Sequence, residues 1–100
     1  MIVDVWSWNA NPGKAGEATK LCVQTAELIR KYPKATARVL RPRNGDMMKV
    51  YLLTECETQV ELDECWAIFW GSEEVKDLMK HHAEYLNQDT SRRYQYNDAG

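Results

Sequence analysis

The repeat period of the apolar residues changes several times along this 100-residue chain, and the order of those changes constrains the fold more than any other feature. A period of two residues indicates a strand, whereas a period of three to four residues indicates a helix. The successive periods predict a strand, a helix, two strands, a second helical region and a last strand. This βαββαβ order predicts one α+β domain that spans residues 1–100.

The first strand and the first helix are predicted from the N-terminal third. Residues 1–9 alternate with a period of two, which places Asp4, Trp6 and Trp8 on one face of a strand. Residues 11–14 contain Asn, Pro and Gly and therefore predict a turn. The helix that follows is expected to continue to about Lys31, because Pro33 cannot extend it.

The second and third strands are predicted over residues 35–41 and 47–54. The pair Asn44 and Gly45 lies between them and favours a hairpin turn with positive φ. The third strand is apolar on both faces, which carry Met48, Val50 and Leu52 on one side and Met47, Tyr51 and Leu53 on the other. Two helices can cover only one face of such a sheet, so another body must cover the second face.

A second helical region is expected from about Thr58, with a break at Gly71 and a possible N-cap at Ser72. Apolar residues recur at helical spacing on both sides of the break: Leu62, Cys65, Trp66, Phe69 and Trp70, then Val75, Leu78, Met79, His82 and Leu86. Residues 87–90 are expected to form a turn, and residues 92–96 the last strand.

Composition argues against several classes of function. The net charge of −2 gives no general attraction to nucleic acid, and no apolar run approaches the ~20 residues of a membrane span. The N-terminus lacks the features of a signal peptide. Three cysteines without a CxxC motif predict neither a disulfide framework nor a metal site, and they fit a cytoplasmic location. No nucleotide, calcium or zinc-protease motif occurs, so no cofactor is predicted.

Four features together suggest a resemblance to a known superfamily. They are the early first strand, the turn at residues 11–14, the hairpin at Asn44 and Gly45, and the tryptophan-rich helix broken at Gly71. The chain resembles the dimeric α/β-barrel superfamily, which has a ferredoxin-like fold, and is similar to NIPSNAP-type and antibiotic-biosynthesis-monooxygenase-like proteins. The resemblance implies a homodimer in which two sheets pack face to face as a barrel. RNA-recognition motifs and acylphosphatases share the element order, but their binding motifs are absent.

His82 is the leading candidate for a catalytic residue. It is the only ionisable residue on the apolar stripe of the second helical segment, so it is expected to face inward. The resemblance implies a catalytic or ligand-contacting histidine on this helix, and an imidazole can act as a general base. The alternative is a histidine at the edge of the core that donates to a backbone carbonyl. His81 is expected at the surface.

A ligand pocket is the second hypothesis. If the face of the first strand that carries Asp4, Trp6 and Trp8 points into the barrel, these residues line a pocket with Arg38, Tyr51 and either Tyr94 or Tyr96. Trp70 on the second helix is a further candidate ligand-binding residue. In the alternative interpretation, the tryptophans fill the barrel and Asp4 pairs with Arg38 or Lys49.

Two hypotheses about function therefore stay open, and the sequence does not decide whether the protein is an enzyme. One is a monooxygenase-like protein that oxidises a small aromatic ligand with His82 as base. The other is a non-catalytic homodimer that binds a ligand or has a structural role. A haem-degrading enzyme is a third alternative, but the asparagine that those enzymes carry in the first strand corresponds here to Trp6.

Overall fold

The computed structural model describes residues 1–100. Its strands and helices are, in chain order, β1 (Ile2–Ala10), α1 (Ala15–Ile29), β2 (Thr36–Leu40), β3 (Lys49–Cys56), α2 (Gln59–Trp70), α3 (Glu73–Met79), α4 (His82–Tyr85) and β4 (Leu86–Asn97). The strands form one antiparallel sheet in the order β2-β3-β1-β4. No helix is long and apolar enough to span a bilayer.

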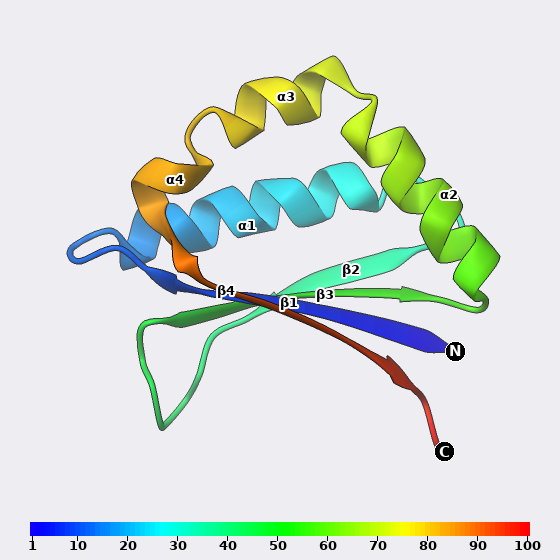
Figure 1. Cartoon of the computed structure of the whole chain (residues 1–100), viewed down its shortest axis with the longest axis horizontal. Coiled ribbons are helices and arrows are strands. Elements are labelled where there is room, and N and C mark those ends of the chain that lie inside the picture. Colours follow the sequence, from blue (N-terminus) through cyan, green and yellow to red (C-terminus); the bar gives the residue numbers. More distant parts are fainter.

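All helices lie on one face of the sheet, and no helix covers the other face (Figure 1). Helix α1 contacts β2 and β3, while the later helices pack around α1 on the same side. This arrangement confirms the predicted α+β, ferredoxin-like fold.

The register of the sheet assigns each side chain to the helix-covered face or to the open face. Trp6 lies opposite Leu52 on β3 and Arg93 on β4, and this row faces the helices. The adjacent row belongs to the open face and consists of Arg38, Leu53, Val5 and Tyr94. Because successive residues of a strand alternate between faces, residues of the two rows cannot line one cavity within the chain.

The core lies between the helix-covered face and the helices. Ala18, Leu21 and Ile29 of α1 are buried against it, together with Leu62 of α2 and Leu86 of β4. The three cysteines are also buried and unbridged. Burial raises the pKa of Cys22 to about 12 and that of Cys65 to about 11, so these thiols stay protonated and are not nucleophiles at neutral pH.

The second helical region departs from the predicted stripe. Helix α3 ends at Met79, α4 begins at His82, and Leu86 belongs to strand β4 rather than to a helix. Strand pairing explains why α4 ends before Leu86, because Leu86 pairs with Ala10 of β1. In addition, Asn11 Nδ2 donates to the carbonyl oxygens of Ala83 and Glu84 at 3.1 and 2.8 Å, which satisfies carbonyls that α4 leaves free.

The predicted turn at residues 87–90 is therefore wrong, since these residues belong to β4. The pairing of β4 with β1 contains an irregularity between Ser7 and Asn9. At that point the backbone N–H of Asn9 donates to Thr90 Oγ1 at 2.8 Å instead of to a strand carbonyl. Such an irregularity interrupts the two-residue alternation of side chains, which is the pattern used to predict a strand.

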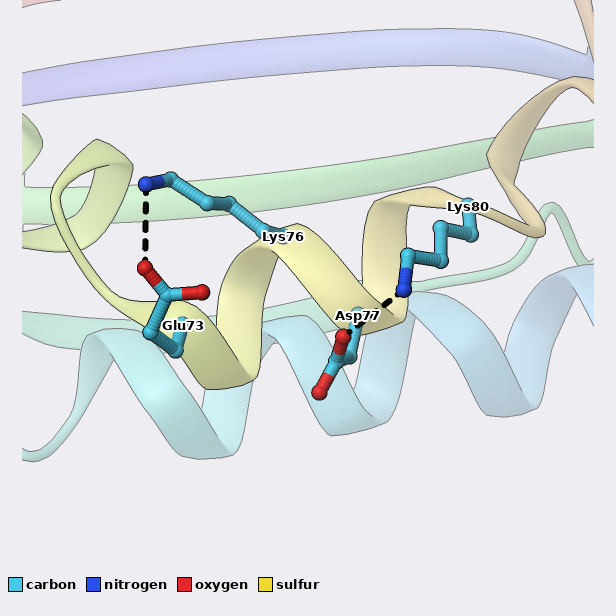
Figure 2. Close-up of polar contacts among 4 residues, drawn as sticks. All are labelled: Glu73, Lys76, Asp77 and Lys80. Atoms are coloured by element: carbon cyan, nitrogen blue, oxygen red, sulfur yellow. Dashed lines mark hydrogen bonds and ion pairs between the residues drawn. The ribbon is translucent and has the colours of Figure 1, made fainter.

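Two helices begin at the expected hydroxyl residues, but only one residue caps its helix. Thr58 accepts a hydrogen bond from the backbone N–H of Glu61 at 3.2 Å, whereas the side chain of Ser72 makes no capping hydrogen bond. The outer side of α3 carries the exposed pairs Glu73–Lys76 at 3.2 Å and Asp77–Lys80 at 3.0 Å (Figure 2). Exposed pairs of this kind contribute at most about 0.5 kcal/mol each.

Candidate functional site

A cavity of about 290 Å³ lies between the helix-covered face of the sheet and the helices. All four tryptophans of the chain line it. Strands β1, β3 and β4 and helices α1 to α4 all contribute, and the lining residues are Trp6, Trp8, Cys22, Thr25, Leu52, Trp66, Phe69, Trp70, Met79, His82, Gln88 and Ser91.

The aromatic rings of the cavity wall form a continuous cluster. Trp6 and Trp8 are neighbours on one strand face, and their rings stack with centroids 5.4 Å apart and an interplanar angle of 19°. Trp66 of α2 stands edge-on to Trp6 at 5.9 Å, and it stacks with Trp70 at 6.3 Å. The spacing of four residues between Trp66 and Trp70 brings both to one side of α2. The wall is therefore built from a strand and a helix that face each other.

A buried carboxylate lies beside this wall, on the same face of the sheet. Asp4 is 1% exposed, and its Oδ1 accepts from Arg93 Nε at 2.9 Å. The guanidinium carbon of Arg93 lies 5.2 Å from the ring centre of Trp6 and 5.6 Å from that of Trp66, within the range of cation–π attraction. The predicted pairing of Asp4 with Arg38 or Lys49 is wrong. Arg93 is the partner because β4, on the other side of β1, presents it on the same face as Asp4.

His82 is half-buried at the opposite end of the stacked pair Trp6 and Trp8. Its ring stands edge-on to Trp8 with centroids 5.1 Å apart and an interplanar angle of 75°. Its Nδ1 lies 2.7 Å from the side-chain Nε2 of Gln88. Burial lowers the pKa of His82 below its usual value, which favours a neutral imidazole at pH 7. The ring makes no hydrogen bond to a backbone carbonyl, in contrast to the alternative that the sequence left open.

The structure brings four of the predicted site residues to one cavity and separates the others from it. Trp6, Trp8, Trp70 and His82 all line the cavity. Asp4 lies on the same sheet face, beside Trp6, and does not line the cavity. Arg38 and Tyr51 lie on the open face, as do Tyr94 and Tyr96. Arg38 there pairs with Glu55 at 3.4 Å. The grouping of Arg38 and Tyr51 with Trp6 and Trp8 in one pocket is thus wrong for the single chain.

Several residues of the site were not predicted. Trp66 and Phe69 stood on the apolar stripe of the second helix, and this position was a usable signal. Gln88 and Ser91 of β4 carried no such signal. A turn was expected at residues 87–90, so the start of the strand, and hence the face to which each side chain points, was not predicted. Ser91 Oγ accepts from Trp6 Nε1 at 2.9 Å and so fixes the orientation of the Trp6 indole. No three His, Cys, Asp or Glu side chains lie close enough together to hold a metal ion.

Comparison of sequences identifies no relative of the chain: no protein-family model and no curated protein matches it. Solved structures do match over nearly the whole chain. An uncharacterised NIPSNAP domain protein from Burkholderia xenovorans is 15% identical, with a TM-score of 0.83 over 100% of this chain and 96% of its own. An antibiotic biosynthesis monooxygenase is also 15% identical, with a TM-score of 0.74 over 100% of both chains.

A third match is a variant of SnoaB, a cofactor-independent oxygenase from Streptomyces nogalater. It is 14% identical, with a TM-score of 0.72, and the alignment covers 99% of this chain and 93% of that one. The predicted resemblance is confirmed at the level of fold, since the chain shares the ferredoxin-like α/β fold of NIPSNAP-domain and antibiotic-biosynthesis-monooxygenase proteins. Sequence identities this low support a shared fold but not a shared activity.

Proposed function

We propose that the protein binds a small, flat aromatic compound in the cavity between its sheet and its helices. The observation that carries this proposal is the convergence of all four tryptophans and Phe69 on one cavity of about 290 Å³. An aromatic wall beside an open volume exposes apolar surface, and a ligand that covers it gains roughly 25 cal/mol per Å². The cavity has the size that suits a compound of about two fused rings.

The shape of the wall favours a flat ligand over a branched aliphatic one. The rings of Trp6 and Trp8 are inclined to each other by only 19° with centroids 5.4 Å apart, so they stack on one another as a flat aromatic pair. Trp66 and His82 stand edge-on at its two ends, each at 75° to its tryptophan neighbour. A flat ring can meet these aromatic side chains either face-on or edge-on, and both contacts are favourable for aromatic pairs.

Monooxygenase-like catalysis is the second candidate function. It is favoured by a neutral imidazole on the cavity wall and by the fold shared with SnoaB, which is a cofactor-independent oxygenase. In this hypothesis His82 takes a proton from the aromatic ligand through Nε2. That role requires an unprotonated Nε2, and hence a proton on Nδ1. Because Nδ1 faces the amide nitrogen of Gln88, the observed hydrogen bond favours binding over proton abstraction.

A second copy of the chain is proposed to cover the open face of the sheet. That face carries Val5, Leu53 and Tyr51, which are half-buried, and also Tyr94 and Tyr96, which are 57% and 54% exposed. An apolar surface of this extent, crossing β3, β1 and β4, is typical of a contact with another protein. The same face on a second copy is its natural complement, because a two-fold axis pairs a surface with itself.

Binding can be tested with indane and 1-indanone, two-ring compounds small enough for the cavity, by isothermal titration calorimetry. We expect saturable binding of 1-indanone at one site per chain. Trp70→Ala removes one ring of the wall and should weaken binding about tenfold, equivalent to ~1.4 kcal/mol. Val60→Ala is the matched control, because Val60 is on the same helix, is 66% exposed and does not line the cavity. Absence of binding to both compounds at millimolar concentration would refute the proposal.

A further inference from the structure

The hydrogen bonds of Gln88 determine which nitrogen of His82 carries the proton. The side-chain Nε2 of Gln88 lies 2.9 Å from the carbonyl oxygen of Leu86 and 2.7 Å from His82 Nδ1. A carbonyl oxygen can only accept, so the amide atom beside it must be the nitrogen. That nitrogen has two hydrogens, and the second one points to an acceptor at Nδ1. His82 Nδ1 is therefore unprotonated, and the neutral ring has its proton on Nε2.

The Nε2–H of His82 is free to act on a ligand. The only hydrogen bond that the ring makes within the chain is the one at Nδ1. The imidazole lines the cavity and touches the edge of the stacked tryptophan pair through Trp8. At this end of the aromatic surface, the cavity thus presents a hydrogen-bond donor.

The indole N–H of Trp66, at the other end of the stacked pair, is not accessible from the cavity. Trp66 is 9% exposed and lines the cavity with other atoms, but its Nε1 is fully buried and has no hydrogen-bond partner in the chain. Its neighbour Trp6 differs, since Trp6 Nε1 donates to Ser91 Oγ at 2.9 Å. Burial of an indole N–H without an acceptor costs about 1–3 kcal/mol. A ligand in the cavity does not reach this nitrogen, so the donor that it meets is the one on His82.

The other polar groups of the wall are already engaged or meet water. Thr25 Oγ1 donates to the carbonyl of Leu21 at 2.9 Å, and burial keeps Cys22 a neutral thiol. Gln88 is exposed, so water can satisfy its carbonyl oxygen. The ring nitrogen that the wall offers to a bound molecule is therefore a donor, His82 Nε2–H.

We infer that the cavity selects flat ligands that carry a hydrogen-bond acceptor, such as a carbonyl or phenolate oxygen, and that His82 Nε2–H binds this acceptor. Gln88 acts as the positioning residue: its amide N–H donates to Nδ1 of His82 and so keeps the proton of the neutral ring on Nε2. This inference rests on the proposed function, because it specifies which aromatic compounds the same cavity accepts.

The test compares 1-indanone with indane, which has the same rings but no carbonyl. A cavity without donors would bind indane more tightly, because the carbonyl of 1-indanone would lose its hydrogen bonds to water on entering. We expect the opposite order, with 1-indanone bound at least threefold more tightly in calorimetric titrations. Addition of 1-indanone, but not of indane, should shift the Nε2 resonance of His82, assigned with His82→Gln.

The role of Gln88 is tested with Gln88→Met, which keeps the length of the side chain and removes the amide. The preference for 1-indanone should fall severalfold in this variant, with little change in the affinity for indane. Gln95→Met is the matched control, since Gln95 is on the same strand and does not line the cavity. Long-range ¹H–¹⁵N NMR spectra of the ligand-free protein at pH 7.5 should show a protonated Nε2 and an unprotonated Nδ1 in His82.

The outcomes separate this inference from the proposed function. Equal affinities, or tighter binding of indane, would overturn the inference and leave the aromatic site in place. A protonated Nδ1 in the free protein would overturn it as well. Failure of both compounds to bind would overturn the proposed function, and the inference along with it.

Discussion

Burial keeps the imidazole of His82 neutral, and this affects stability as well as binding. The pKa of His82 is lowered in the folded protein relative to its usual value of 6.5, because burial removes part of the water that would stabilise the charged ring. The unfolded chain exposes the same ring and binds a proton below pH 6.5. Protonation therefore favours the unfolded state over a defined range of pH.

We predict that the free energy of unfolding falls between pH 7 and pH 5 in part through His82. Above pH 6.5 both states carry a neutral ring, and the group contributes no pH dependence. Below that pH the unfolded state binds more protons, so stability decreases by up to ~1.4 kcal/mol per pH unit until the folded pKa is reached. Urea unfolding of the wild type and of His82→Gln at several pH values measures this slope.

The variant His82→Gln should show a shallower loss of stability over this range than the wild type. His81→Gln is the matched control, because His81 is the neighbouring histidine and its side chain is 60% accessible. If the two variants have the same slope, burial of His82 does not control the pH response.

At the scale of elements, the capping of α2 shows how a local sequence signal sets a boundary. Thr58 precedes α2, has an extended backbone and accepts from the N–H of Glu61. Ser72 occupies the same position before α3 but makes no such bond. Both were recognisable as hydroxyl residues before a helical stripe, while the actual hydrogen bond depends on the side-chain rotamer.

We predict that Thr58→Ala lowers the free energy of unfolding by about 1 kcal/mol, because one N–H of the first turn of α2 loses its acceptor. Ser72→Ala is the matched control and should change stability by less than about 0.5 kcal/mol, since no capping hydrogen bond is lost. Chemical denaturation at pH 7 measures both. Equal losses for the two variants would contradict a capping role that is specific to Thr58.

Strand β4 is the element that the sequence predicted least well. Its first residue, Leu86, continues the spacing of the preceding helix, and Asn87 begins the expected turn, yet the two pair with Ala10 and Asn9 of β1. Pairing with a distant strand, and the irregularity near Ser7, override the local pattern. Because Gln88 and Ser91 are on this strand, the same error concealed two residues of the site.

At the scale of the whole molecule, the two faces of the sheet differ in what covers them. Helices cover the face that carries Trp6 and Leu52, while the face that carries Val5 and Leu53 is open (Figure 1). Val5 and Leu53 are opposite each other at the centre of the sheet, and Arg38 and Tyr94 flank them. A second copy that covers this row would bury its apolar side chains without disturbing the cavity on the other side.

We predict a sedimentation mass near twice the 11.6 kDa of the chain at micromolar concentration. Leu53→Glu should convert the dimer into a folded monomer, because it places a charge at the centre of the proposed contact while the core on the other face is unchanged. Val60→Glu on the exposed side of α2 should leave the dimer intact. Wild-type protein that sediments as a monomer would exclude the pairing.

The sequence by itself determined the order of strands and helices, because side-chain periodicity is a local property of the chain. It also determined that Trp6 and Trp8 share a face and that Trp66 and Trp70 belong to one helical stripe. The tertiary structure decided which face the helices cover, and hence that Arg38 and Tyr51 are separated from the tryptophans.

The tertiary structure also decided that Arg93 partners Asp4 and that Gln88 bonds His82. Asp4 and Arg93 meet because the register of β1 and β4 joins residues 89 positions apart. Periodicity fixes which residues share a face of an element, but it contains no information about the neighbour across the sheet. For this reason the aromatic residues of the site were predictable, whereas the polar partners that orient them were not.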